Sequence, residues 1–253
     1  MSFIRFSMTR DDEPDFTSYT ISQLVKTKKP YGWEKVFEEG QMELNNIGEI
    51  LDRIEHMNGI RCFPARNDIF KAFDLTALSD VKVVVVGQDP YHDTYFNGIP
   101  RAQGLSFSSP RGAPIPPSLK TIYKELNRMN PDYIHPTHGD LEYWAQQGVL
   151  MLNMCLTVDP GKPNSHKKIW YEFLNVVCKA INIANPNCIY LCWGKKSQDI
   201  AQMAGSKSII LTAGHPSPLN RNNDFVGCDH FNIANQLLIS NGRNPIDWFI
   251  PEQ

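Results

Sequence analysis

The densest group of reactive side chains in this sequence follows an apolar run, in the stretch VVVVGQDPYHD at Val83–Asp93. Four valines lead into Gly87, and an amide, a carboxylate, a phenol and an imidazole then come within five positions. Such groups hold and transfer protons, and imidazoles and carboxylates also bind metal ions. A lone Asp after a strand is more often a turn or cap residue, so the elements around this stretch decide between a site and a turn.

Four short apolar runs are the candidate strands: Val81–Val86, Val149–Leu152, Cys188–Trp193 and Ser208–Thr212. Runs of this kind are typical of strands that are buried on both faces of a parallel sheet. Helical patterns cover residues 33–58, 68–73, 119–129, 141–147, 170–183 and 229–240. Gly40 and Gly48 favour two helices over one in the first of these ranges, and Ser118 is the expected N-cap of the third. Alternating strands and helices predict an α/β fold with one doubly wound sheet.

Polar residues follow three of the four expected strands. Asp89 comes after the first, Asn153 after the second and His215 after the fourth. In open parallel sheets, ligands bind beyond the carboxyl ends of the strands, so these three side chains are expected to converge on one pocket. Taken singly, an Asn at the end of a strand is usually a turn residue, and a His is usually a structural residue. Their expected position at the same edge of the sheet favours a functional site.

The pattern alone leaves the reaction open. A metal-dependent hydrolase can use Asp89, His92, Asp93 and His215 as ligands, because carboxylates and imidazoles are common metal ligands. A binding module can use the same pocket without any chemistry. Insensitivity to a chelator separates the first alternative from a metal-free reaction.

Composition narrows the class of protein. The chain has 253 residues, of which 42% are hydrophobic, and this suits one α/β domain with a full core. Its net charge of −2 means that any binding of nucleic acid depends on a local basic patch. The six cysteines contain no CxxC pair, which favours free thiols in a reducing compartment over a disulfide framework or a metal cluster. No apolar run is long enough to cross a membrane.

The first residues carry no recognisable targeting signal. They lack both the apolar core of a signal peptide and an acid-free pattern typical of a transit peptide. We expect residues 1–30 to form a flexible leader, residues 31–253 to form the catalytic domain, and the protein to be intracellular, in the nucleus or the cytoplasm.

Motifs along most of the chain together resemble family 1 uracil-DNA glycosylase. They are GQDPYH at Gly87–His92, GLSFS at Gly104–Ser108, PPSLKTIYKEL at Pro116–Leu126, GVLMLNMCLTV at Gly148–Val158, NSH at Asn164–His166, HPSPL at His215–Leu219, FVGCDHF at Phe225–Phe231 and PIDW at Pro245–Trp248. Each is weak alone, but the ordered set, from about Trp33 to Trp248, is very specific.

The resemblance implies a single-domain α/β/α sandwich around a four-stranded parallel sheet. It implies hydrolysis of the N-glycosidic bond of deoxyuridine in DNA, with no cofactor and no metal. The implied substrate is uracil-containing single- or double-stranded DNA, and the implied protein partners are a proteinaceous inhibitor and replication proteins. We expect a monomer.

The resemblance also assigns roles around the base. Asp89 positions the attacking water and faces the cationic sugar, and a neutral His215 donates to uracil O2 as negative charge builds there. Asn153 reads O4 and N3–H, since an amide carries both an acceptor and donors. Phe107 stacks on the uracil, and Tyr91 fills the place of a 5-methyl group. The backbone of Gln88 matches a position that contacts O2.

A second set of residues is expected to contact the DNA backbone and the base stack. Leu219 enters the gap that the flipped base leaves. The resemblance implies a phosphate contact for Ser217, a backbone contact at Gly194 with Lys195, and for His92 a contact near the 3′ phosphate or the water. Ser118, at the start of a helix, is a candidate phosphate site as well as an N-cap. Lys167, Lys168, Lys195, Lys196 and Arg221 form an expected basic rim, for which ordinary solvated surface is an equal alternative.

The chain departs from the family pattern in three places. Residues 93–103, DTYFNGIPRAQ, form a longer loop than usual after His92. Lys195 stands where the family has a serine, and Asn223 where it commonly has an arginine. We expect these changes to affect DNA binding more than chemistry, with the arginine and the aromatic residues of the longer loop against the DNA backbone or an unstacked base.

Overall fold

Four parallel strands form the centre of the protein, whose fold is given by a computed structural model that describes residues 14–222 and 224–252. The strands are β1 (Val83–Gly87), β2 (Val149–Asn153), β3 (Ile189–Trp193) and β4 (Ile209–Ala213), in the spatial order β2-β1-β3-β4. Val83 of β1 is in register with Val149 on one side and with Ile189 on the other. All four apolar runs thus became strands, and each pair is parallel.

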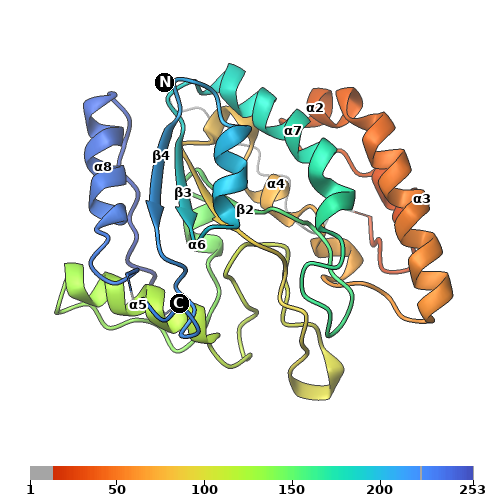
Figure 1. The fold of residues 1–253 in the computed structure, drawn as a ribbon, viewed down its shortest axis with the longest axis horizontal. Helices are drawn as coiled ribbons and strands as arrows, with labels where there is room; N and C mark the ends of the chain where they lie inside the picture. The colour runs from red at the N-terminus through yellow and green to blue at the C-terminus, as the bar shows by residue number, and fades with distance from the viewer. Residues whose placement is uncertain (1–13, 223, 253) are drawn as a thin grey trace.

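Helices cover both faces of this sheet, as the sequence predicted (Figure 1). They are α1 (Ile21–Thr27), α2 (Glu34–Glu39), α3 (Gln41–Asn58), α4 (Lys71–Leu75), α5 (Pro117–Met129), α6 (Glu142–Ala145), α7 (Lys167–Ala184) and α8 (His230–Ser240). In Figure 1, α8 and α5 lie on one side of the strands, and α7 with α2 and α3 on the other. The result is the expected three-layer α/β/α sandwich.

The core explains why the apolar runs fold where they do. Every residue of β1, β2 and β3 is buried, and α7 packs a stripe that includes Trp170, Phe173 and Val177 toward the interior. Burial of such side chains stabilises the fold by roughly 1.5–3 kcal/mol each. β4 differs from the prediction of two buried faces, because its residues are only half-buried or exposed.

The first helical range divides into two helices at Gly40, as predicted, and α3 runs through Gly48. A Cβ on Gly48 would lie 2.8 Å from the Cα of Ser22, so this glycine lets α1 pack closely on α3. Ser118 is not an N-cap: α5 begins at Pro117, whose fixed φ and missing N–H suit a first helical position.

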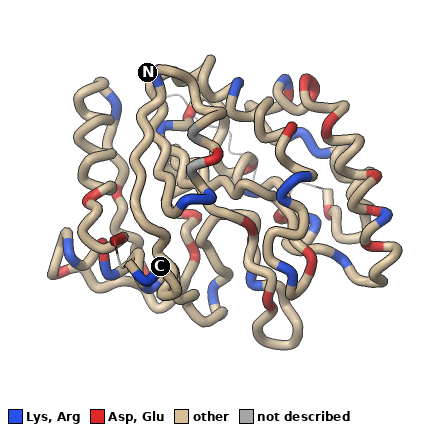
Figure 2. The backbone as a smooth tube through the Cα atoms, in the orientation of Figure 1, with Lys and Arg blue, Asp and Glu red and all other residues tan. Residues whose placement is uncertain are grey.

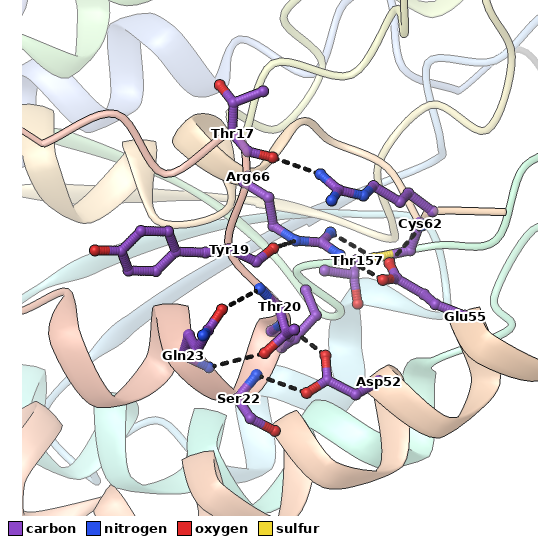
Figure 3. A network of polar contacts seen from close by, with 12 residues as sticks. Thr17, Tyr19, Thr20, Ser22, Gln23, Asp52, Glu55, Cys62, Arg66 and Thr157 are labelled. Atoms are coloured by element: carbon purple, nitrogen blue, oxygen red, sulfur yellow. Dashed lines mark hydrogen bonds and ion pairs between the residues drawn. The ribbon is translucent and has the colours of Figure 1, made fainter.

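Residues 14–30, expected to belong to a flexible leader, are instead folded onto the domain (Figure 3). The Asp52 carboxylate accepts the N–H groups of Ile21 and Ser22 at 2.7 and 3.1 Å, and α1 has a reciprocal capping box. Arg66, which is paired with Glu55, donates to the Tyr19 carbonyl at 3.1 Å. The polar composition concealed a short amphipathic helix. Residues 1–13 lie outside the described residues.

Charge is mixed over the surface. Figure 2 shows Lys and Arg interspersed with Asp and Glu along most of the chain. Among the described residues, no helix is both long and apolar enough to cross a membrane.

Candidate active site

A cavity of about 310 Å³ opens beyond the carboxyl ends of the strands. It brings Asp89, Asn153 and His215 together, as their places after three parallel strands predicted. The other predicted residues that line it are Gln88, Tyr91, His92, Phe107, Ser118, Ser217 and Leu219. Ala102, Gln103, Gly104, Leu105 and Pro163 also line it; sequence reasoning did not name these as site residues.

Asn153 and Gly87 form the floor of the cavity at neighbouring strand ends. They are register partners in β1 and β2. The Asn153 side chain is buried, and its Oδ1 has no hydrogen-bond partner among the described residues. A Cβ on Gly87 would lie 2.1 Å from that oxygen, so only glycine leaves room for it. A buried, unpaired acceptor costs free energy unless a ligand supplies a donor.

Asp89 holds its carboxylate at the side of the same cavity. Its Oδ2 accepts the backbone N–H of Asn164 at 2.7 Å. Burial raises the pKa of this carboxyl above its ordinary value, while the Asn164 hydrogen bond and the charges of His92 and Lys196 work in the opposite direction. The group is therefore a partly desolvated anion with one oxygen fixed by the backbone.

Asn164 is a functional residue that sequence reasoning quoted within a motif but gave no role. Its φ of 62° places it in the left-handed region, which Asn tolerates better than most residues. Its N–H points at Asp89, and its side-chain Oδ1 accepts from Gln88 Nε2 at 2.6 Å. The NSH motif was the available signal, but nothing in it showed that a backbone N–H was the active group.

A buried chain of hydrogen bonds holds the loop that carries Asn164. Trp170 Nε1 donates to Thr157 Oγ1 at 2.7 Å, and that hydroxyl lies 2.9 Å from His166 Nδ1. His166 Nε2 lies 3.0 Å from Asp159 Oδ1. Burial lowers the pKa of His166, so the neutral ring accepts from Thr157 and donates to Asp159. These contacts tie the two ends of segment 157–166 to each other.

His215 has a defined tautomer. Its Nδ1 accepts the backbone N–H of Ser217 at 2.9 Å, so the proton of the neutral ring lies on Nε2. Burial, assisted by the charge of Lys196, lowers the pKa of this imidazole. Gly194 has a φ of 90°, and a Cβ there would lie 2.9 Å from that of His215. The site therefore holds a neutral donor in a position that requires a glycine beside it.

Two aromatic residues form one wall of the cavity. The Tyr91 hydroxyl donates to the Phe107 carbonyl at 3.0 Å, and Phe107 has a φ of 61°. The Phe107 ring lies 5.3 Å from Trp193 and 6.0 Å from His215, measured between ring centroids. Burial raises the pKa of Tyr91, which keeps the phenol neutral. The phenol thus fixes both rings as a rigid apolar surface.

The residues predicted to contact the DNA backbone occupy the mouth of the cavity and its surroundings. Leu219 is 89% exposed at the mouth, and Ser217 Oγ accepts the Leu219 N–H at 3.2 Å. Gly194 and Lys195 line an adjoining hollow that shares His215, Ser217 and Leu219 with the cavity.

Other members of the expected rim lie apart from both hollows. Arg221 is exposed and lines neither of them. Lys167 is paired with Asp199 at 2.7 Å. Asn223 lies outside the described residues. Of the expected basic rim, Lys195 lines the adjoining hollow, while Lys196 lines neither hollow and its charge acts on the pKa values of Asp89 and His215.

The described residues do not favour a metal centre. Within residues 14–222 and 224–252, no three His, Cys, Asp or Glu side chains are arranged so that they could hold an ion. Asp93, one of the four ligands considered from the sequence, is paired with Arg101 at 2.9 Å.

Comparison with known proteins gives a consistent result. A sequence model of the Uracil DNA glycosylase superfamily matches residues 73–239. The Uracil-DNA glycosylase of Dichelobacter nodosus is 48% identical over 192 residues, which cover 75% of this chain and 81% of that protein. The one from Klebsiella pneumoniae is 41% identical over 224 residues, covering 87% and 95%.

A solved structure extends the comparison to the fold. The crystal structure of mimivirus uracil-DNA glycosylase matches with a TM-score of 0.83 and 26% identity, over 93% of each chain. A Y322F variant of the mimivirus protein, solved in complex with UGI, matches with a TM-score of 0.83 and 25% identity, over 94% of this chain and 97% of that one.

Proposed function

This chain belongs to the uracil DNA glycosylase superfamily and excises uracil from DNA, and we propose that Asp89 and His215 carry the chemistry in the cavity described above. Glycosidic cleavage builds positive charge on the sugar and negative charge on the departing base. Preorganised groups of opposite charge or polarity stabilise such charges most effectively. The carboxylate of Asp89 and the Nε2 donor of His215, which line one cavity, supply the pair.

The observation that carries the choice of uracil as the base in this cavity is the unpaired Oδ1 of Asn153. A pyrimidine with a carbonyl next to an N–H matches an amide that has an acceptor and donors. Uracil N3–H can donate to the buried Oδ1, while the amide N–H₂ donates to O4. Cytosine presents the reverse order of donor and acceptor at these atoms, so the same amide discriminates between the two bases.

The aromatic wall supplies the second element of specificity. Phe107 offers a face for stacking, and Tyr91 is held against it by its hydrogen bond to the Phe107 carbonyl. A 5-methyl group on the base would meet the Tyr91 ring. Rejection of thymine by steric exclusion needs a wall that does not move, and a fixed phenol meets that need.

The reaction then follows from the positions of the charges. The uridine is flipped out of the stack, because a base within a duplex cannot be reached. Asp89 binds the attacking water and faces the sugar as its positive charge develops. The neutral His215 donates to O2 through Nε2, and Gln88 contributes its backbone at the same oxygen. Leu219, which is exposed at the mouth, occupies the space that the base leaves.

Contacts to the DNA backbone complete the proposal. Ser118, Ser217 and His92 line the cavity together with Asp89. Gly194 and Lys195 border the adjoining hollow, where the phosphate next to the uridine binds. Arg221 contributes charge from the exposed loop after Leu219.

We further propose that the catalytic domain spans residues 31–253 together with α1, and that the protein acts as a monomer inside the cell, in the nucleus or the cytoplasm. The six cysteines carry free thiols, which suits a reducing compartment. An inhibitor protein of the UGI type blocks the same cavity, and replication proteins are the other expected partners. Both single- and double-stranded DNA are substrates.

Binding of the free base tests the central observation. Trp193, which packs against Phe107, provides a fluorescence signal. We expect uracil to quench it and thymine to leave it unchanged. Asn153→Ala should weaken uracil binding by roughly tenfold to a hundredfold, since a lost hydrogen bond to a buried group costs about 1–3 kcal/mol. Asn175→Ala, on the surface of α7, is the control. Equal uracil affinity of Asn153→Ala and wild type would refute the assignment.

A further inference from the structure

The longer loop after His92 is a hairpin with a defined shape. Tyr95 N–H donates to the Ile99 carbonyl at 2.9 Å, and Arg101 N–H to the Asp93 carbonyl at 3.1 Å. A short 3₁₀ turn, Phe96–Gly98, forms its tip, with Asn97 at a φ of 53°. In Figure 1 this yellow hairpin extends away from the sheet, beyond the carboxyl ends of the strands.

Arg101 braces the base of this hairpin. Its Nε donates to Asp93 Oδ2 at 2.9 Å and its Nη1 to the Pro114 carbonyl at 2.7 Å. Only 15% of its side chain is exposed. The guanidinium ties the hairpin to itself and to the neighbouring loop, and these contacts occupy two of its five N–H donors. A braced hairpin loses little conformational entropy when it binds a ligand.

The tip presents apolar side chains and no charge. Phe96 is 73% exposed and Ile99 is 46% exposed. No charged residue lies between Asp93 and Arg101, and Figure 2 shows the tip free of both colours. An uncharged tip offers no ion pair to a phosphate. A flat exposed ring on a rigid turn instead suits the face of an unstacked base.

The hairpin is continuous with the active site. His92 precedes it, Ala102 and Gln103 end it, and all three line the cavity. Four residues from 93 to 96 span at most about 13 Å, at about 3.3 Å for each extended residue. This length corresponds to about four stacked nucleotides at about 3.4 Å each. The Phe96 ring can therefore reach the same DNA strand whose uridine occupies the cavity, a few nucleotides away.

We propose that Phe96 is a second base-binding site, which stacks on an unpaired base of the uracil-containing strand a few nucleotides from the flipped uridine. Ile99 flanks the same contact. The partner is single-stranded DNA, because base pairing and stacking in a duplex hide the faces of the bases. The inference rests on the proposed function, since it assumes that the uridine lies in the cavity.

The test compares Phe96→Ala with wild type on single strands of two lengths. One carries a single deoxyuridine with about two nucleotides on each side, and the other has about ten, so that only the longer one reaches the hairpin tip. Affinity is measured by fluorescence anisotropy with Asp89→Asn in the background of both proteins, so that the strand stays intact. Phe96→Trp keeps an aromatic face. Ile183→Ala, at an exposed position on the last turn of α7, controls for loss of an exposed apolar side chain.

We expect Phe96→Ala to bind the longer strand about tenfold more weakly and the shorter strand as well as the parent does. Phe96→Trp should retain full affinity, and the dependence of affinity on salt should be unchanged, because no ion pair is lost. Equal affinity of Phe96→Ala and its parent for the longer strand would overturn the proposal, and so would an equal loss on both strands. Uracil release by the wild type from the shorter strand is scored separately; its absence would count against the proposed function itself.

Discussion

Replacement of Asp89 by Asn separates charge from shape in the active site. The amide oxygen of Asn can still accept the Asn164 N–H, which the carboxylate accepts at 2.7 Å. The variant therefore keeps the loop and the cavity but loses the negative charge that faces the sugar. Two unit charges about 4 Å apart interact by about 4 kcal/mol at an effective dielectric constant of about 20. The expected loss is thus about a thousandfold in the rate of cleavage.

The raised pKa of Asp89 leads to a second expected result, which concerns stability and the pH dependence of the rate. Burial raises that pKa, so the folded protein binds a proton at this site more tightly than the unfolded chain does. Between the unfolded and the folded pKa, stability therefore falls as pH rises, and at neutral pH the ionised carboxylate costs stability. Asn carries no charge, and we expect Asp89→Asn to have a Tm at neutral pH equal to or above that of wild type. The wild-type cleavage rate should decline on acidification at a higher pH than an exposed Asp would give.

The assay is single-turnover cleavage of a deoxyuridine-containing oligonucleotide under saturating enzyme, with a parallel binding titration and a thermal melt. We expect a large loss of rate, nearly unchanged affinity and no loss of Tm. A rate within about tenfold of wild type would show that the carboxylate charge does not stabilise the transition state, since the interaction would then be worth no more than about 1.4 kcal/mol.

The other predictions concern specificity and positioning. Tyr91→Ala should release thymine from DNA, because the ring that excludes a 5-methyl group is gone; base release from thymidine at a defined position measures it, and no release contradicts the assignment. Asn153→Asp should gain release of cytosine and lose release of uracil, measured on matched oligonucleotides; unchanged preference would contradict the role. His166→Asn should lower kcat while KM stays the same. It should also move the acid limb of the pH–rate profile to higher pH, because the Asn164 N–H that lowers the pKa of Asp89 is displaced. A lower Tm with an unchanged pH–rate profile would show that His166 has a purely structural role.

Sequence patterns predicted the sheet and the convergence of Asp89, Asn153 and His215 well. The reason is physical: buried parallel strands leave near-continuous apolar runs, and their carboxyl ends share one edge. β4 is the exception: its residues are half-buried or exposed, whereas those of β2, the other edge strand, are all buried. How much of an edge strand the neighbouring helices and loops cover is not encoded in the strand's own apolar run. α1 was not predicted because it has only seven residues, three of them with buried apolar side chains. So short an apolar pattern is hard to distinguish within a polar segment.

Contacts made by the backbone could not be predicted at all. The Asn164 N–H can reach Asp89 because Asn164 has a left-handed φ and because His166 holds the same loop through its contact with Asp159. Neither feature can be predicted from the residue types. Arg101 shows the limit of residue type: the type suggested a phosphate contact, and the fold also uses two of its donors for Asp93 and Pro114. Residue identity indicates what a group can bind, and tertiary structure decides which partner it has.

The most direct test of the whole account is release of free base from oligonucleotides that differ only in one nucleotide, carrying U, T or C, with EDTA present throughout. We predict release of uracil from the U strand at an undiminished rate in EDTA, and none from the T or C strands. Failure to release uracil, or a rate that falls when the chelator is added, would contradict the claim that Asp89, Asn153 and His215 form a metal-free, uracil-specific active site.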